Sequence, residues 1–489
     1  MSTMDTCGAT DRHHRTLFPR LQVVATAAVL AVAGGCTHVN RPLNGGDVQL
    51  ERRAHNRTRA AAFVEIATPP KVASNQADDT VAQPRPADPE SRMADVAAGD
   101  RNGDGYFVGL AISGGGSRSA NFAAACMFQL QRIGLLQRVD YVSSVSGGSL
   151  TAAYYCAADD DAWNPAEVQK RLTHHFATDL IVQTLLPWNV VGMLVTHLDR
   201  SDLLANTFRD HLFTRDGKHL TYADLRPDRP RLLVNATDLQ SGRRFVFTNE
   251  SFDQLNSDLS AYPLAYAVAA SGSVPVLLHQ VTLRDFSTTF KQYRHLIDGG
   301  VTDNLGVLSL VEVYNAQRDA ARAAGVPDPY PRGAVFIVLD ARTQYDARLS
   351  AMGDTGLIET LASSLGLTST VLLNRASSAT LSDLVVKNAP DGSTAEQLRQ
   401  NIAELEGAGY IELRDKGDQP VRVVHLALSS VNDLKNLPFA SFRERVSTVG
   451  TYFNIDPTEA YHLYQAADLL VQEKFERQLR ELNDEMDER

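Results

Sequence analysis

Residues 138–150 read RVDYVSSVSGGSL, and this stretch organises the prediction for the whole chain. Its first half is rich in β-branched and aromatic residues, which predicts a short buried strand. Its second half turns at Ser146-Gly147-Gly148 and continues into the small, apolar run LTAAYYC, which predicts the start of a helix. A serine on such a strand-to-helix turn points its hydroxyl out of the top of the sheet. Ser146 is therefore the candidate nucleophile.

The spacing around Ser146 is S-x-S-x-G, one residue away from the G-x-S-x-G pattern of a nucleophile elbow. The turn needs small neighbours, because a larger side chain would collide with the strand or the helix. Ser144, Gly147 and Gly148 meet this demand. A purely structural turn would explain the pattern if it stood alone, so two further segments decide the interpretation.

A glycine-rich loop precedes the elbow. Residues 106–112 (YFVGLAI) form a short apolar run that predicts a buried strand, and it stops at SGGGSRS, residues 113–119. Glycines between a strand and a helix free backbone N–H groups to bind an anion, helped by the helix dipole. A dinucleotide-binding motif would need glycine in place of Ser119, and a P-loop would need a lysine. An oxyanion hole fits, because it needs only exposed N–H donors near a nucleophile.

An aspartate follows later in the chain, in HLIDGGV, residues 295–301. An acidic residue beside glycines usually belongs to a turn. Here it is the third member of an ordered set: glycine-rich loop, serine elbow and Asp-Gly-Gly. That order resembles the patatin-like phospholipase family, and two lesser segments agree with it, ASGSVP at 270–275 and the predicted hairpin at 235–243. The resemblance covers about residues 106–342.

The resemblance implies an α/β fold with a three-layer α/β/α core and a Ser-Asp dyad that needs no histidine and no cofactor. Ser146 would attack an ester carbonyl, and Asp298 would accept its proton and then activate the water that clears the acyl-enzyme. The N–H groups of Gly115 and Gly116 would stabilise the oxyanion, with Gly114 shaping the loop.

Two positions qualify this assignment. Ser144 stands where the family most often has glycine, and serine is small enough to keep the turn. Arg118 would add positive charge at the oxyanion loop, or would be a solvated arginine at a helix start. Neither position removes the predicted chemistry.

A Ser-His-Asp esterase is the alternative hydrolase. His295 precedes Asp298, while His425 and His462 follow it, as an α/β-hydrolase order would require. None has a distinctive setting, and His425 lies in a predicted strand, VRVVHLAL, where we expect a satisfied core histidine. A catalytically silent, lipid-binding scaffold is the second alternative, and acyl transfer to an acceptor other than water is the third.

The N-terminus predicts export and lipidation. Arg12, Arg15 and Arg20 precede the apolar run 21–35, which has the shape of a secretory signal and ends at Cys36. The ending resembles a lipoprotein signal, in which the cysteine becomes the lipidated first residue, although Ala33 and Gly34 depart from that pattern. Ordinary signal cleavage and a retained anchor are the alternatives. Thr37 in place of aspartate favours a bacterial outer-membrane lipoprotein, attached to the membrane surface through its lipid.

Composition limits the partners. The net charge of −11 provides no basic field for nucleic acid. The cysteines form no C-x-x-C pair, so we predict no metal site, and we expect Cys126 and Cys156 to be buried free thiols. The expected partner is a phospholipid or another acyl ester.

The chain divides into four predicted parts: a signal peptide at 1–35, a flexible tether at 36–104, the catalytic core at 105–345, and a mostly helical C-terminal portion at 346–489 with one strand that rejoins the core. Residues 181–198 (IVQTLLPWNVVGMLVTHL) are apolar but interrupted by polar residues and Pro187. We predict that this run packs in the core, with a lid or a lipid-facing segment as the alternative.

Overall fold

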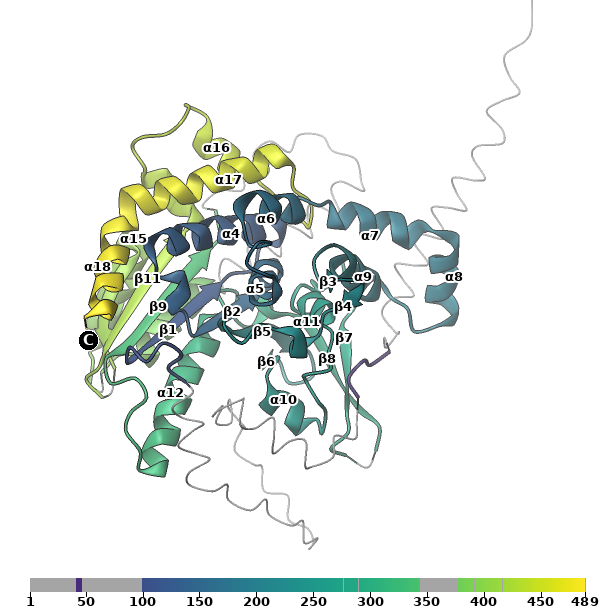
Figure 1. Ribbon diagram of the computed structural model, residues 1–489, viewed down its shortest axis with the longest axis horizontal. Coiled ribbons are helices and arrows are strands. Elements are labelled where there is room, and N and C mark those ends of the chain that lie inside the picture. Colours follow the sequence, from purple (N-terminus) through teal and green to yellow (C-terminus); the bar gives the residue numbers. More distant parts are fainter. Residues whose placement is uncertain are drawn as a thin grey trace, which may run out of the picture.

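The computed structural model describes residues 41–45 and 99–488, apart from residues 276, 289, 344–376, 391 and 416. The predictions for the signal peptide, for Cys36 and for nearly all of the tether lie outside the described residues. The α/β class and the layered patatin-like core are confirmed: one sheet lies between two layers of helices (Figure 1).

Within the described residues, nine strands form the central sheet in the order β10-β11-β9-β1-β2-β5-β8-β7, with β6 paired to β5. Five neighbouring strands run parallel: β11 (Pro420–Ala427), β9 (Gly333–Asp340), β1 (Tyr106–Ile112), β2 (Tyr141–Val145) and β5 (Arg231–Asp238). The others are antiparallel to their neighbours: β10 (Tyr410–Arg414), β6 (Arg243–Val246), β7 (Val281–Asp285) and β8 (Gln292–Asp298). A separate small hairpin joins β3 (Thr214–Arg215) and β4 (Lys218–His219).

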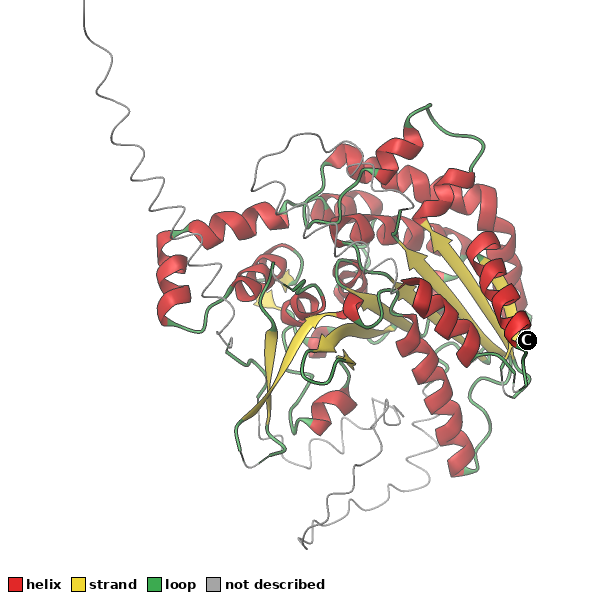
Figure 2. Ribbon diagram, turned by 180° about the vertical axis from the view of Figure 1, so that it is seen from behind, coloured by secondary structure: helices red, strands yellow, loops and turns green. Residues whose placement is uncertain are grey.

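Apolar side chains cover both faces of the sheet. One face packs against α4 (Gly116–Ile133), α5 (Gly148–Ala157), α11 (Leu264–Ser271) and α17 (Pro457–Leu470). The other face packs against α12 (Val307–Ala324), the helical residues 377–387 and α15 (Ala395–Ala408), as Figure 2 shows from behind. Strands that are buried on both faces explain the continuous apolar runs that the sequence shows at β1 and β9.

The remaining described helices surround this core. They are α6 (Pro165–Leu172), α7 (Phe176–Leu185), α8 (Pro187–Val195), α9 (Arg200–His211), α10 (Asn249–Gln254), α16 (Phe442–Ser447) and α18 (Glu476–Asp487), with a π-helical turn at Val471–Phe475 between α17 and α18. Cys126 and Cys156 are buried free thiols, as expected.

One prediction is wrong. The run 181–198 does not pack in the core: α8 has no buried residue, and α7 has only Phe176. Figure 1 shows α7 and α8 at one end of the molecule, away from the sheet. Composition could not reveal this, because an apolar run looks the same whether a core or a partner covers it.

The register of the sheet sets up the site. Ile112 pairs with Ser144 on one side and with Leu339 on the other, so the loops after β1, β2 and β9 leave the same edge of the sheet. On β5, Asn235 pairs with Val145 and the next residue, Ala236, pairs with Asp298. The end of β2 and the end of β8 therefore meet at one level, on either side of β5.

Candidate active site

The turn after β2 has the geometry of a nucleophile elbow. Ser146 has φ +50°, a left-handed conformation that is strained for a residue with a side chain. Its backbone N–H donates to Ser271 Oγ at 2.8 Å, and Ser271 Oγ in turn donates to the carbonyl of Asn235 at 2.6 Å. The elbow is therefore held by a hydrogen-bonded connection to β5 and α11.

Ser146 and Asp298 meet directly. Ser146 Oγ donates to Asp298 Oδ2 at 2.8 Å, and both residues are buried. The other carboxylate oxygen, Oδ1, accepts the N–H of Gly300 at 2.7 Å, so the aspartate is oriented by the glycine turn that follows it. The backbone of Asp298 is fixed as well, because its N–H donates to Ser273 O and its carbonyl accepts Thr237 Oγ1.

Burial changes the acidity of the aspartate. Loss of solvent raises the pKa of Asp298 from its usual value near 3.8 to about 6, while the hydrogen bonds from Gly300 and Ser146 oppose the shift. A carboxylate with a raised pKa is a stronger base than an ordinary surface carboxylate. At neutral pH it is still ionised and able to accept the Ser146 proton.

The glycine-rich loop lies against the elbow. An added Cβ on Gly147 would lie 2.0 Å from the carbonyl oxygen of Gly116, so the two turns touch backbone to backbone. The N–H of Gly114 donates to Asn304 O at 2.9 Å, which leaves Gly114 to shape the loop. Among the described residues, no acceptor is found for the N–H groups of Gly115 and Gly116.

Arg118 is not the solvated arginine of the alternative prediction. It is buried, and its Nη1 donates to the carbonyl of Val449 at 3.1 Å. It therefore ties the C-terminal segment 449–454 to the start of α4. The same segment reaches the loop a second time, because Ser117 N–H donates to Tyr452 O at 2.9 Å.

The histidines considered as alternatives have other partners. His425 is buried in β11, and its Nε2 lies 3.1 Å from Asp340 Oδ2. Arg342 and His425 hold the pKa of Asp340 down, to about 2. The Nδ1 of His295 lies 3.2 Å from Thr282 Oγ1, and His462 packs its ring against Phe439 and Phe442. In the part of the chain that the structure describes, no histidine bonds to Ser146 or Asp298.

Sequence reasoning missed the residues that support the elbow. Asn235 is buried, and its Nδ2 donates to Ser143 Oγ and to the carbonyl of Ser144, while Ser309 Oγ donates to its Oδ1. Ser271 lies in the ASGSVP segment. The resemblance of this segment to the family is a sequence signal for Ser271, but the resemblance assigns it no role. Asn304 donates Nδ2 to Ser377 Oγ, and its buried Oδ1 has no hydrogen-bond partner in the described residues.

Comparison with known proteins finds a family match for part of the chain. A family model described as patatin-like phospholipase matches residues 110–311. A search of curated protein sequences finds no match.

Solved structures of human GIVD cytosolic phospholipase A2 are similar. One has a TM-score of 0.44 and 12% identity, covering 93% of this chain and 67% of that one. Another, in complex with methyl gamma-linolenyl fluorophosphonate, has a TM-score of 0.41 and 13% identity, covering 79% and 59%. VipD from Legionella pneumophila has a TM-score of 0.26 and 13% identity, covering 74% of this chain and 66% of that one.

Proposed function

Residues 110–311 are a patatin-like phospholipase domain, and from this premise we propose that the protein is a serine hydrolase that cleaves acyl esters of phospholipids or related lipids. The domain supports a lipid acyl hydrolase in general. The observation that carries the finer proposal is the 2.8 Å hydrogen bond from Ser146 Oγ to Asp298 Oδ2 at a strained elbow.

The proposed mechanism has two stages. Ser146 Oγ attacks the ester carbonyl while Asp298 accepts the hydroxyl proton, and the alcohol leaves with that proton. Asp298 then accepts a proton from water, the hydroxide attacks the acyl-enzyme, and the fatty acid leaves as Ser146 regains its proton. In both stages the negative charge on the carbonyl oxygen is stabilised by the N–H groups of Gly115 and Gly116.

A buried site supports this use of a carboxylate base. Ser146 and Asp298 are 6% and 3% exposed, so little water competes for the hydrogen bond between them. Low solvent exposure also strengthens the attraction between the N–H donors and an oxyanion. An aspartate with a pKa of about 6 accepts the serine proton at lower energetic cost than one near 3.8.

The test is hydrolysis of p-nitrophenyl butyrate by the full chain, beside Ser146→Ala and Asp298→Asn. We expect both variants to lose about 10³-fold or more of kcat/KM, because each removes a member of one catalytic unit. Ser441→Ala is the matched control, since Ser441 is exposed and remote in sequence from the site. Circular dichroism shows whether each variant is folded.

Each alternative has its own outcome in this test. Full activity of Asp298→Asn would place the base elsewhere and reopen the histidine mechanism. A folded wild type that is inert on short and long acyl esters, and that does not react with a fluorophosphonate, would favour the silent scaffold. An acyl product other than the free fatty acid would indicate transfer to another acceptor.

We also propose that the protein is a lipoprotein of the bacterial outer membrane, lipidated at Cys36. The support is the sequence alone: arginines precede the apolar run 21–35, Cys36 follows its end, and Thr37 stands after the cysteine. Metabolic labelling with an alkyne fatty acid tests the proposal. Label is expected on the wild type, in the outer-membrane fraction, and not on Cys36→Ser. Equal labelling of both would overturn it.

A further inference from the structure

The helix pair α7–α8, residues 176–195, exposes an apolar surface that nothing in the described chain covers. Seven of the fifteen exposed large hydrophobic side chains of the described residues lie between Ile181 and Val195. The following six are more than 55% exposed: Ile181, Leu185, Trp188, Val191, Leu194 and Val195. We call them the α7–α8 surface. Exposed large apolar side chains that are concentrated on one helix pair mark an interaction site.

The segment that carries the α7–α8 surface is apolar and has no acidic, lysine or arginine side chain. No Asp, Glu, Lys or Arg occurs between Asp179 and Asp199. Four polar side chains in this run have partners within the protein: Gln183 Nε2 donates to Thr207 Oγ1, Asn189 Nδ2 to Gln183 O, Thr184 Oγ1 to Leu180 O, and Thr196 Oγ1 to Gly192 O. Each of these four side chains would therefore keep one hydrogen bond within the protein if the surface moved into hydrocarbon.

The dimensions favour shallow insertion. No single described helix is long and apolar enough to cross a membrane, whereas the bent pair Pro165–Leu185 and Pro187–Val195 passes that test on length and composition with a bend of 74°. The nine residues of α8 span about 14 Å, half of the roughly 30 Å of a hydrocarbon core. A bent apolar pair with an exposed tryptophan suits the interface, where indole rings concentrate.

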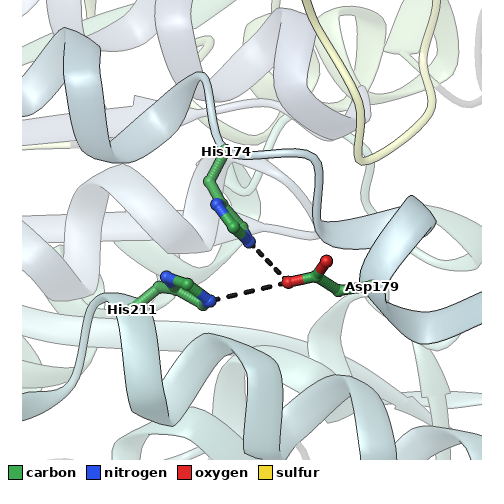
Figure 3. A group of neighbouring side chains, drawn as sticks. All are labelled: His174, Asp179 and His211. Carbon is green, nitrogen blue, oxygen red and sulfur yellow. Dashed lines mark hydrogen bonds and ion pairs between the residues drawn. The ribbon is translucent and has the colours of Figure 1, made fainter. Parts of the chain in front are cut away.

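The base of the pair is fixed to the body. His174 Nε2 lies 2.7 Å from Asp179 Oδ2 on α7, and His211 Nε2, at the end of α9, lies 3.6 Å from the same oxygen (Figure 3). The two imidazole rings stack with their centroids 3.6 Å apart. The His174–Asp179 hydrogen bond and the His211–Asp179 contact therefore connect the end of α9 to the start of α7.

The base of the pair also adjoins the candidate active site. Ala177 N–H donates to Phe453 O, and Asn454 Oδ1 accepts the N–H groups of Ala177 and Thr178. The preceding residue, Tyr452, accepts the N–H of Ser117 beside the glycine-rich loop. One short segment therefore contacts both the first turn of α7 and the start of α4, which connects the base of the helix pair to the candidate site.

The start of the described chain lies on the same side. Asn44 Nδ2 donates to Arg284 O on β7, and Arg284 N–H donates to Asn44 Oδ1, which fixes residues 41–45 to the sheet. In Figure 1 this segment (purple) lies in the same half of the molecule as α8. Cys36 is five residues before Arg41, and five fully extended residues span at most about 18 Å. A lipid on Cys36 would therefore be attached within about 18 Å of Arg41.

We propose that the α7–α8 surface inserts into the interfacial layer of a phospholipid bilayer and holds the active site at the membrane. This inference rests on the proposed function, because a lipid acyl hydrolase needs access to a substrate embedded in a bilayer. The occupant is the lipid surface itself. Association of two copies through the same surface is the competing outcome.

Tryptophan fluorescence provides the test, because Trp163 is 4% exposed while Trp188 is 66% exposed. The full chain is mixed with vesicles of phosphatidylethanolamine and phosphatidylglycerol containing brominated phosphatidylcholine. We expect a blue shift and bromine quenching of Trp188, both absent in Trp188→Phe. Because Trp188 reports insertion itself, the readout holds even for protein tethered by an N-terminal lipid.

The charged double variant Val191→Asp/Leu194→Asp should lower the partition coefficient of the protein into vesicles at least tenfold. The quenching of Trp188 by brominated lipid should fall by the same factor. Val386→Asp/Tyr461→Asp is the matched control, since Val386 is 51% and Tyr461 is 55% exposed, both lie outside α7–α8, and the pair adds the same two negative charges. We expect the double variant to keep its kcat/KM on soluble p-nitrophenyl butyrate and to lose at least tenfold on vesicle phospholipid.

The outcomes separate the two proposals. Quenching without any hydrolysis would support the docking surface and overturn the proposed function. Hydrolysis without quenching would overturn the docking surface alone. A Trp188 emission that is already blue-shifted without lipid, together with a dimer that Val191→Asp/Leu194→Asp dissociates in sedimentation, would assign the surface to a second copy of the chain.

Discussion

Burial acts in two opposing ways on Asp298, the proposed base. Complete burial makes its carboxylate a better base, but the same burial makes the ionised form costly to hold in the folded protein. The chain offsets that cost with one backbone N–H, from Gly300, and one hydroxyl, from Ser146. A single side chain thus links the chemistry of the site to the stability of the fold.

The pH dependence of hydrolysis follows from the raised pKa of Asp298. The base must be ionised in the free enzyme, so kcat/KM should fall about tenfold per pH unit below about pH 6 and level off above pH 7. The measurement is a pH profile on p-nitrophenyl butyrate from pH 4.5 to 8. Circular dichroism at each pH separates titration from unfolding. Constant activity down to pH 4.5 would contradict the raised pKa.

The stability of the fold should change with pH in the opposite sense. Asp298 has a pKa of about 6 in the folded chain and near 3.8 when unfolded, so the folded state binds the proton more tightly. Its contribution to stability is complete below about pH 3.8 and is lost as the pH rises through about 6. Asp298→Asn never ionises, and we expect it to raise the free energy of unfolding at pH 7.5 by about 2–3 kcal/mol.

Urea unfolding at pH 7.5 and at pH 4.0 measures this effect. The gain from Asp298→Asn should shrink toward zero at pH 4.0, where the wild-type carboxyl is largely protonated. An Asn variant that is less stable than the wild type at pH 7.5 would show that the burial cost is already compensated.

At the scale of elements, the site depends on two loops that touch through their backbones. The elbow after β2 and the glycine-rich loop after β1 approach so closely that Gly147 has no room for a side chain beside Gly116. Because β1 and β2 are paired in parallel, both loops leave the same edge of the sheet. The relative position of the elbow and the glycine-rich loop is therefore set by strand pairing and by two glycines.

Gly147→Ala should separate these loops. The added Cβ would lie 2.0 Å from Gly116 O, so the loop must move, and we expect a loss of about 10²-fold in kcat because the N–H donors shift relative to Ser146. Gly407→Ala is the matched control, since its Cβ would meet nothing within 4 Å. Ester hydrolysis by both variants is the measurement, and equal activity would exclude a role for this contact.

At the scale of the molecule, the catalytic sheet is completed by the end of the chain. β11 pairs with β9 through seven residues, α17 covers α4, and the segment 449–454 reaches the glycine-rich loop. Without these elements β9 would become an open edge of the sheet. The described residues after 376 therefore belong to the same layered fold as the candidate site.

A charge placed in β11 tests this dependence. Val423 is fully buried, so Val423→Asp should destabilise the protein by about 3 kcal/mol or more and reduce the yield of active enzyme. Val386→Asp is the control, because Val386 is 51% exposed and should change stability by about 0.5 kcal/mol or less. Thermal unfolding and active-site titration measure both. A stable, active Val423→Asp variant would contradict a role for β11.

The sequence by itself determined the class of the fold and the candidate catalytic pair. The buried strands β1 and β9 are continuous apolar runs, and the turns at Ser146 and Asp298 need small residues at fixed positions, so both leave a local signal. Glycines at close contacts and apolar strands are requirements of the backbone itself. Such requirements can be recognised without knowing the rest of the structure.

Only the tertiary structure decided what surrounds that pair. Ser271 supports the elbow although it is 125 positions from Ser146, and Asn235 does so although it is 91 positions from Ser144. A single serine or asparagine has no local sequence pattern that reveals such a contact. The run 181–198 was expected in the core, and it lies exposed on α7 and α8. Hydrophobicity measures the tendency of a segment to leave water, whereas the assembled fold determines whether the protein or a partner receives it.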